Sequence, residues 1–153
     1  MNMVLNEILT KQNVFTKLVL NNGEKELPKA LKVKIMRIRM AYTKVKKTFD
    51  DEVQEFTKEL VPQELRDLND KQNKTDADNA RIEELTNKVN SEYQEFLIQK
   101  GLEEVADVID DSFTMDEYSD IVDVNSGNDV EINGNKIKAA DFLEIIYDLF
   151  VKE

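Results

Sequence analysis

The chain has 153 residues, a formal net charge of −11, and neither cysteine nor histidine. A chain of this length buries about two thirds of its surface on folding, so we expect residues 1–153 to form one domain. Without cysteine and histidine, disulfides, thiol nucleophiles, imidazole bases and Cys/His zinc sites are all excluded.

The first twenty residues fit two structures. Met3, Leu5 and Ile8 have helical spacing, whereas "VFTKLVL" at 14–20 fits a short strand. "NNG" at 21–23 ends either one, because Asn and Gly tolerate positive φ.

Nothing near the N-terminus indicates export. We expect no signal peptide, because no basic stretch is followed there by an apolar run. No apolar stretch approaches the ~20 residues that span a bilayer, so we expect no membrane association and a cytoplasmic protein.

A long helix is predicted from Pro28, which suits a first helical turn. Apolar residues then recur at spacings of three and four: Leu31, Ile35, Ile38, Tyr42, Val45, Phe49, Val53, Phe56 and Leu60. This stripe is typical of a coiled-coil-like helix of about 30 residues, which the "VP" at 61–62 interrupts.

A second helix should return along the first. Residues 63–79 are polar and predict a short exposed helix and a loop, with Asp76 or Asp78 as the next N-cap. An apolar stripe from Ile82 to Leu97 follows, and Gly101 is placed to end it. We therefore expect an antiparallel helical hairpin over 28–100.

Residues 102–153 predict a smaller acidic module. "EEVADVI" at 103–109 fits a strand, and a capping box, Thr114 to Glu117, opens a short helix. Asn133-Gly134 predicts a type I′ turn between two strands. The chain closes with a helix whose expected buried face is Phe142, Leu143, Ile146, Leu149 and Phe150. The predicted fold class is α+β, predominantly helical.

Residues 27–49 hold eight Lys or Arg and no acid. With Ile35 at heptad position a, four cations border the apolar seam, namely Lys32, Lys34, Arg39 and Lys46. The other four point outward: Lys29, Arg37, Lys44 and Lys47. We expect the bordering cations to pair with the protein's own acids. Nucleic-acid binding is disfavoured, because no aromatic residue outside the core stripe is free to stack on bases.

Residues 103–131 hold eleven acids and no base. A calcium loop starting at Asp123 fails, because Gly127 and Gly134 occupy the fifth and twelfth positions, where oxygen ligands are needed. We expect no metal and no cofactor. Two interpretations stay open: a solvated acidic face, and docking on a basic partner, in which carboxylates imitate phosphates.

Catalysis is not expected. The four glycines build no phosphate-binding loop, and no serine lies in a nucleophile elbow. The acids lie in polar runs, where they should stay ionised, whereas acid catalysis needs a raised carboxyl pKa.

The stretches "KLVLNNGEKELPKALKVKIMRIRMAYTKVKKTF" and "EYQEFLIQKGLEEV" resemble a group of small acidic proteins of tailed bacteriophages. The resemblance implies a phage setting and action by binding. It implies no activity and supplies no functional residues.

The sequence therefore predicts a non-enzymatic phage accessory protein in the cytoplasm of the infected bacterial cell. It would bind a protein with a basic surface and inhibit a host defence or nucleic-acid-handling protein. The predicted contact residues are Asp110, Asp111, Asp116, Glu117, Asp120 and Asp123. The alternative is a virion protein, or a tail or head assembly protein or chaperone, that forms homo-oligomeric contacts through the helical hairpin.

Overall fold

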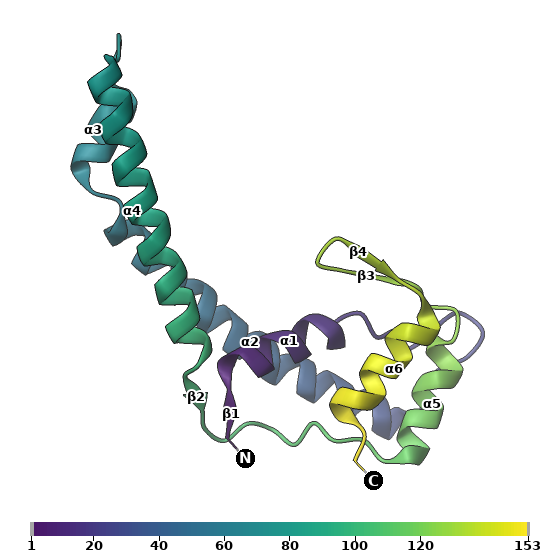
Figure 1. Ribbon diagram of the computed structural model, residues 1–153. Coiled ribbons are helices and arrows are strands. Elements are labelled where there is room, and N and C mark those ends of the chain that lie inside the picture. The colour runs from purple at the N-terminus through teal and green to yellow at the C-terminus, as the bar shows by residue number, and fades with distance from the viewer. Residues whose placement is uncertain (1, 153) are drawn as a thin grey trace. The chain divides into compact units, whose positions relative to one another are not determined.

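The computed structural model describes residues 2–152 and has the predicted α+β fold, predominantly helical (Figure 1). In chain order, its elements are β1 (Met3–Val4), α1 (Leu5–Phe15), α2 (Lys29–Leu60), α3 (Gln63–Asp70), α4 (Asp76–Gly101), β2 (Glu104–Val105), α5 (Met115–Asn125), β3 (Val130–Ile132), β4 (Asn135–Ile137) and α6 (Ala139–Phe150). The long helix, the short helix after it and the closing helix are confirmed.

The chain forms two compact units. The core unit joins residues up to Lys46 with residues from Glu104 onward, and the hairpin unit is Lys47–Glu103. From the sequence we expected the helical hairpin and the acidic module to meet near residue 101. The structure divides the chain within α2, because Leu31, Ile35 and Ile38 are buried in the hydrophobic core of the core unit.

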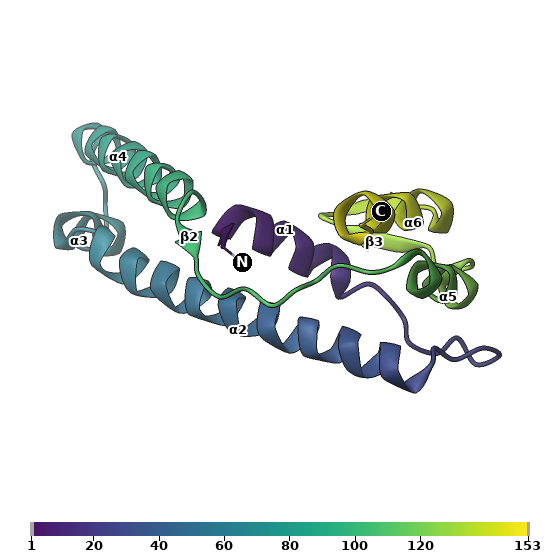
Figure 2. The same ribbon diagram turned by 90° about the horizontal axis from the view of Figure 1, so that it is seen from below.

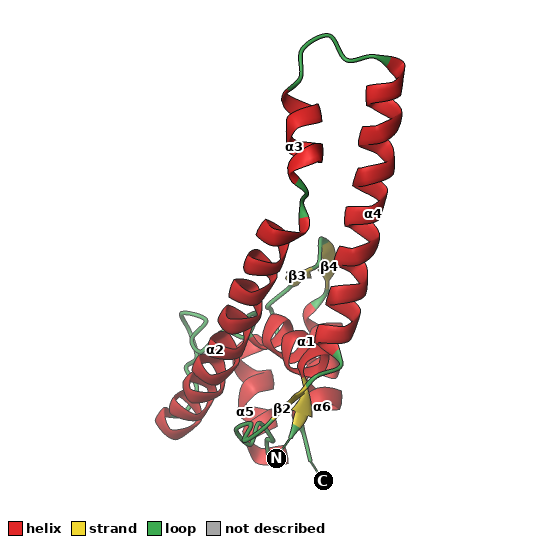
Figure 3. Cartoon of the chain, turned by 90° about the vertical axis from the view of Figure 1, so that its left-hand side faces the viewer, coloured by secondary structure: helices red, strands yellow, loops and turns green. Residues whose placement is uncertain are grey.

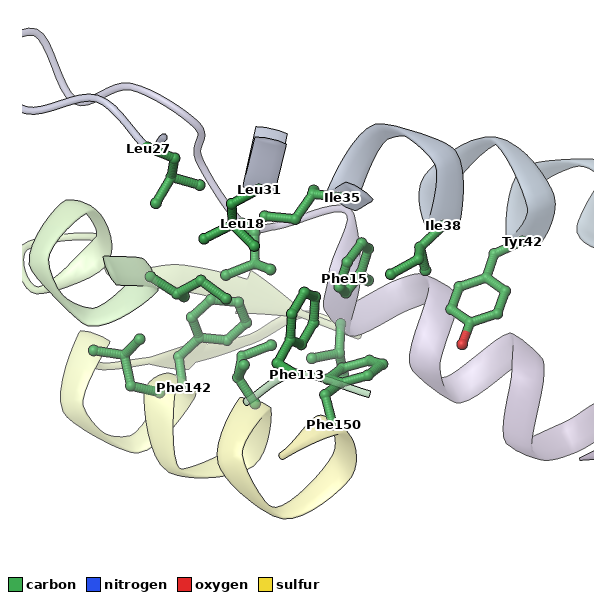
Figure 4. Packing of buried hydrophobic residues seen from close by; sticks show 14 of the residues in the cluster. Phe15, Leu18, Leu27, Leu31, Ile35, Ile38, Tyr42, Phe113, Phe142 and Phe150 are labelled. Atoms are coloured by element: carbon green, nitrogen blue, oxygen red, sulfur yellow. The ribbon is translucent and has the colours of Figure 1, made fainter. Parts of the chain in front are cut away.

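Aromatic residues from distant parts of the chain build the centre of the core unit (Figure 4). The ring of Phe15 lies 5.9 Å from that of Phe113 and 5.1 Å from that of Phe150. Phe113 also forms an isolated bridge with Val151, donating from its N–H to Phe150 O at 2.8 Å. The entry to α5 and the exit from α6 are therefore held together.

The N-terminal ambiguity resolves as a helix. Residues 5–15 form α1, and "VFTKLVL" is not a strand, because Val14 and Phe15 end the helix, Thr16 and Lys17 form a turn, and the residues after them have no regular structure. The "NNG" turn is confirmed: Asn21 Oδ1 accepts from Gly23 N at 2.7 Å, and Gly23 has φ of 91°.

The predicted β-hairpin is also confirmed. β3 and β4 pair antiparallel with Val130 opposite Ile137, and Asn133 and Gly134 both have positive φ, at 52° and 80°. The strand expected at 103–109 is only the two residues of β2, which pair with β1. In α6 the expected buried face is confirmed except for Leu149, which is half-buried.

The hairpin unit contains the end of α2 together with α3 and α4 (Figure 3). The rings of Phe56 and Phe96 stack with centroids 4.0 Å apart. Arg81 bonds both carboxylate oxygens of Glu64, at 2.7 and 2.9 Å.

The expected N-cap of α4 is wrong. Thr75 caps the helix, with a capping box in which Asp78 holds the third helical position and accepts from Thr75 N at 2.9 Å. Hydrogen bonds from Lys71 and Thr75 lower the pKa of Asp78 to about 2. This cap was not predicted from the sequence, because the capping box has Asp78 at the position usually held by Glu or Gln.

Candidate functional site

Helix α5 is fixed at both ends. Its capping box is confirmed, since Glu117 N donates to Thr114 Oγ1 at 3.2 Å and Thr114 N donates to the Glu117 carboxylate at 3.0 Å. At the other end Asn125 is fully buried, accepting from Val19 N at 2.9 Å and donating to Val19 O at 3.1 Å. These bonds satisfy a buried amide side chain and lock α5 to the segment after α1.

Helix α6 lies beside α5 in the core unit (Figure 2). Tyr118 of α5 donates from its hydroxyl to Leu143 O of α6 at 2.8 Å, and its ring meets that of Tyr147 edge-on. The helix pair is therefore a rigid platform for the side chains that point outward from it.

Each of these helices carries three acids at helical spacing. The α5 row is Asp116, Asp120 and Asp123; the α6 row is Asp141, Glu144 and Asp148. Five of the six are exposed, and Asp120 is half-buried. Within residues 2–152, none of the six forms an ion pair with a Lys or Arg. We call the two sets together the carboxylate rows.

The negative field of the α6 row reaches α5. The pKa of Tyr118 is raised, first by partial burial and then by the charges of Asp148 and Glu144. Burial is the larger cause, and the α6 carboxylates add to it because they disfavour a phenolate beside them.

The structure separates the six predicted contact residues into two groups. Asp116, Asp120 and Asp123 lie together in the α5 row. The other three, Asp110, Asp111 and Glu117, are held by internal contacts.

Asp111 is misassigned as a contact residue. Asp111 is buried, with only 3% of its surface exposed. Its Oδ2 forms an ion pair with Lys11 Nζ at 2.9 Å. The Tyr42 hydroxyl donates to the same carboxylate oxygen, and burial, then this hydrogen bond, raises the pKa of Tyr42. Lys11 itself is buried, with Nζ 5.4 Å from the centroid of the Phe150 ring. This network connects α1, α2 and the loop before α5.

Asp110 and Glu117 are also engaged. Asp110 accepts from Ser112 N at 3.0 Å and Ser112 Oγ at 2.7 Å, and these bonds lower its pKa. Glu117 accepts from Lys34 Nζ at 2.9 Å. Partial burial raises its pKa, but the bonds from Thr114 and Lys34 outweigh this effect, and the pKa is lowered overall.

The basic segment is partly used inside the core unit, as expected for cations that border the seam. Lys34 pairs with Glu117, and Lys32 pairs with Glu26, which precedes the helix instead of belonging to the acidic run. Arg39 donates to the carbonyl of Leu18, so a backbone group takes the place of the expected acid.

The α6 row is not among the predicted contact residues. Its acids recur at intervals of three and four opposite the apolar face of α6, and this spacing is readable from the sequence. They lie outside the run without bases, because Lys136 and Lys138 separate that run from α6.

Among residues 2–152, no three or more Asp and Glu side chains lie together in a way that could hold a metal ion. None of the helices in the described residues is long and apolar enough to cross a membrane.

Comparison with protein-family models, with curated proteins and with solved structures gives no match. The resemblance to tailed-phage proteins therefore remains an expectation from the sequence.

Proposed function

We propose that the protein acts without catalysis, by binding a protein that presents a basic surface to the carboxylate rows. The observation that supports this most is that no Lys or Arg of residues 2–152 pairs with any of the six acids, while Asp111 and Glu117 of the acidic run 103–131 are paired internally. An uncompensated set of like charges on a rigid helix pair attracts a basic surface and speeds its approach.

The carboxylate rows also lower the stability of the helices that carry them. Like charges four residues apart, as in Asp116 and Asp120 or Glu144 and Asp148, cost about 0.2–0.5 kcal/mol per pair. Acids that only solubilise the protein do not need to recur four residues apart on one helix face. The arrangement therefore favours docking on a partner.

In the phage setting that the resemblance implies, the partner would be a host defence or nucleic-acid-handling protein in the bacterial cytoplasm. Proteins of this kind bind phosphates with Lys and Arg. Asp116 and Asp123 are seven positions apart, or about 10.5 Å along the helix axis. A row of this length would occupy a phosphate-binding groove and block it.

The test begins with recovery of the tagged protein from bacterial lysate and identification of a stoichiometric companion. The companion is then purified, and its affinity is measured for the wild type and for Asp120→Lys/Asp123→Lys. We expect at least a tenfold loss for this variant, and a similar loss for the wild type when salt rises to about 0.5 M.

The matched control is Asp51→Lys/Asp70→Lys, which makes the same charge change at exposed acids of the hairpin unit. It should bind as the wild type does. Equal affinity of the wild type and the α5-row variant for the companion would refute the proposal.

A second candidate, assembly through homo-oligomeric contacts, is favoured by the hairpin unit. Of its large apolar side chains only Leu65 and Leu85 are fully buried, while Phe56, Tyr93 and Phe96 are half-exposed and Ile98 is 62% exposed. If this seam joins copies of the chain, Ile98→Glu should weaken self-association without unfolding the hairpin, as sedimentation velocity would show.

A further inference from the structure

Helix α2 presents an apolar and basic face to solvent in the core unit. Val33, Met36 and Met40 are 40%, 51% and 71% exposed. At 100° per residue they lie on the side of the helix opposite its buried stripe of Leu31, Ile35, Ile38 and Tyr42. Lys29 and Arg37 lie on the same outward side and are exposed. We call these five residues, Lys29, Val33, Met36, Arg37 and Met40, the α2 outer face.

The α2 outer face has no partner within its own chain. Lys32, Lys34 and Arg39, on the flanks of the helix, are bound to Glu26, Glu117 and the Leu18 carbonyl. Lys29 and Arg37 pair with no acid of the described residues. Three large apolar side chains next to two unpaired cations on one rigid helix form a surface that a protein partner would cover.

The carboxylate rows do not supply that partner within the same molecule, since none of their six acids pairs with Lys29 or Arg37 among residues 2–152. The acids of α6 point away from Phe142, Ile146 and Phe150, which face the core from one side. The α2 outer face points away from Leu31, Ile35 and Ile38, which face the same core. The α6 row and the α2 outer face both turn away from this shared core, so they meet only between molecules.

We propose that the α2 outer face of one molecule binds the α5 row of a second copy. The inference rests on the proposed function, because it names a second copy as a partner of the same carboxylates. Charge complementarity supports it: the α5 row carries only acids, and the polar residues of the α2 outer face are both cations.

The two surfaces also match in length and apolar content. Asp116 to Asp123 spans about 10.5 Å of helix axis, and Lys29 to Arg37 spans about 12 Å. Met115 is 49% exposed at the start of the α5 row and supplies an apolar side chain for Met36 and Met40. Methionine is flexible enough to adapt to such a contact.

A contact of this kind joins two different surfaces, so it is heterologous and leaves one free copy of each surface at the ends of the assembly. Unless the copies close into a ring, self-association should therefore rise continuously with concentration instead of stopping at a dimer. It should also fall as salt screens the charges.

A charge swap tests the contact directly by sedimentation velocity. The first variant, Lys29→Glu/Arg37→Glu, reverses the α2 outer face, and the second, Asp120→Lys/Asp123→Lys, reverses the α5 row. Each alone should self-associate at least tenfold more weakly than the wild type. Their equimolar mixture should associate again. The basic α2 outer face of the second variant can bind the acidic α5 row of the first, and the reversed, acidic α2 outer face of the first can bind the reversed, basic α5 row of the second. A chain with all four substitutions should likewise recover.

Circular dichroism and urea unfolding check that each variant is folded, and Asp51→Lys/Asp70→Lys should associate as the wild type does. The inference is overturned if the wild type stays monomeric at about 1 mM and low salt. It is also overturned if the mixture fails to restore association, or if Ile98→Glu alone abolishes it.

The two proposals fail in different ways. A monomeric wild type that still binds a basic companion through Asp120 and Asp123 removes only the second-copy inference. An α5-row variant that loses self-association but keeps its companion removes only the companion-binding proposal.

Discussion

Helix α2 runs through both units, and the same apolar spacing has a different outcome in each. In the core unit Leu31, Ile35, Ile38 and Tyr42 are all buried. Farther along the helix, in the hairpin unit, Phe49, Val53, Phe56 and Leu60 continue the spacing but are only half-buried.

The difference follows from how many elements converge. The core unit surrounds α2 with residues of α1, α5, α6 and the segment before α5, so each apolar side chain is enclosed. The hairpin unit has only α3 and α4 beside the end of α2, and this small number of elements leaves one side of each seam residue open. We therefore expect local opening at lower free energy in the hairpin unit than in the core unit.

The largest expected effect comes from truncating a core aromatic. Phe15→Ala removes a fully buried ring and should lower the free energy of unfolding by about 3–5 kcal/mol. Phe56→Ala, which removes a half-exposed ring, should cost roughly 1–2 kcal/mol, because water fills the space that remains. Urea unfolding followed by circular dichroism measures both. Equal losses would contradict the contrast between the units.

Breaking the buried ion pair of the core unit should be nearly as costly. Asp111→Ala leaves Lys11 charged and buried with only the longer ion pair to Glu7, at 3.7 Å, and should cost about 3 kcal/mol. The double variant Lys11→Met/Asp111→Leu removes both charges and should be more stable than Asp111→Ala in the same urea measurement. A double variant no more stable than Asp111→Ala would contradict the buried charge of Lys11 as the cause of the loss.

Alkaline pH should destabilise the core unit through Tyr42. Burial and the bond to Asp111 raise its pKa, so the folded protein keeps a proton that the unfolded chain releases near pH 10.0. Above that pH the unfolded state binds fewer protons than the folded state. The free energy of unfolding should therefore fall with pH, by up to about 1.4 kcal/mol per pH unit.

Urea unfolding at a series of alkaline pH values measures this slope, and ultraviolet absorbance follows phenolate formation. In Tyr42→Phe the slope should be shallower. A wild-type Tyr42 that ionises reversibly without unfolding would contradict the assignment.

The smallest effect compares two similar capping boxes. Thr75→Ala in the hairpin unit and Thr114→Ala in the core unit should each cost about 1 kcal/mol. The loss should appear in different places, because the buried Asn125 ties α5 to the core whereas the start of α4 is held to α3 by an exposed contact, Arg81 to Glu64. Hydrogen exchange should speed up only in the first turns of α4 for Thr75→Ala, and across the core unit for Thr114→Ala. The same exchange pattern in both variants would mean that the two units open together.

Local chemistry was readable from the sequence. Pro28 and the apolar spacing predicted α2, Thr114 and Glu117 predicted the start of α5, and Asn133-Gly134 predicted the hairpin turn. These features depend on residues a few positions apart, whose preferences are set by backbone dihedrals and hydrogen bonds within one turn. The α6 row had the same kind of signal.

The candidate site was predicted only in part. Asp116, Asp120 and Asp123 share a helix face because of their spacing, and that spacing is in the sequence. Asp110, Asp111 and Glu117 belong to the same acidic run, but their partners are set by backbone turns, by the capping box and by residues far along the chain.

The sequence by itself determined the helices, the turns and the layout of charge, because each is a property of neighbouring residues. Only the tertiary structure decided which charged side chains form ion pairs within the protein and which stay exposed. Lys11 lies 100 residues from Asp111, and no local pattern tells that this acid is buried while Asp123 faces solvent. Burial and ion pairing depend on which distant elements converge, and this is why the carboxylate rows and the α2 outer face emerged only from the folded core unit.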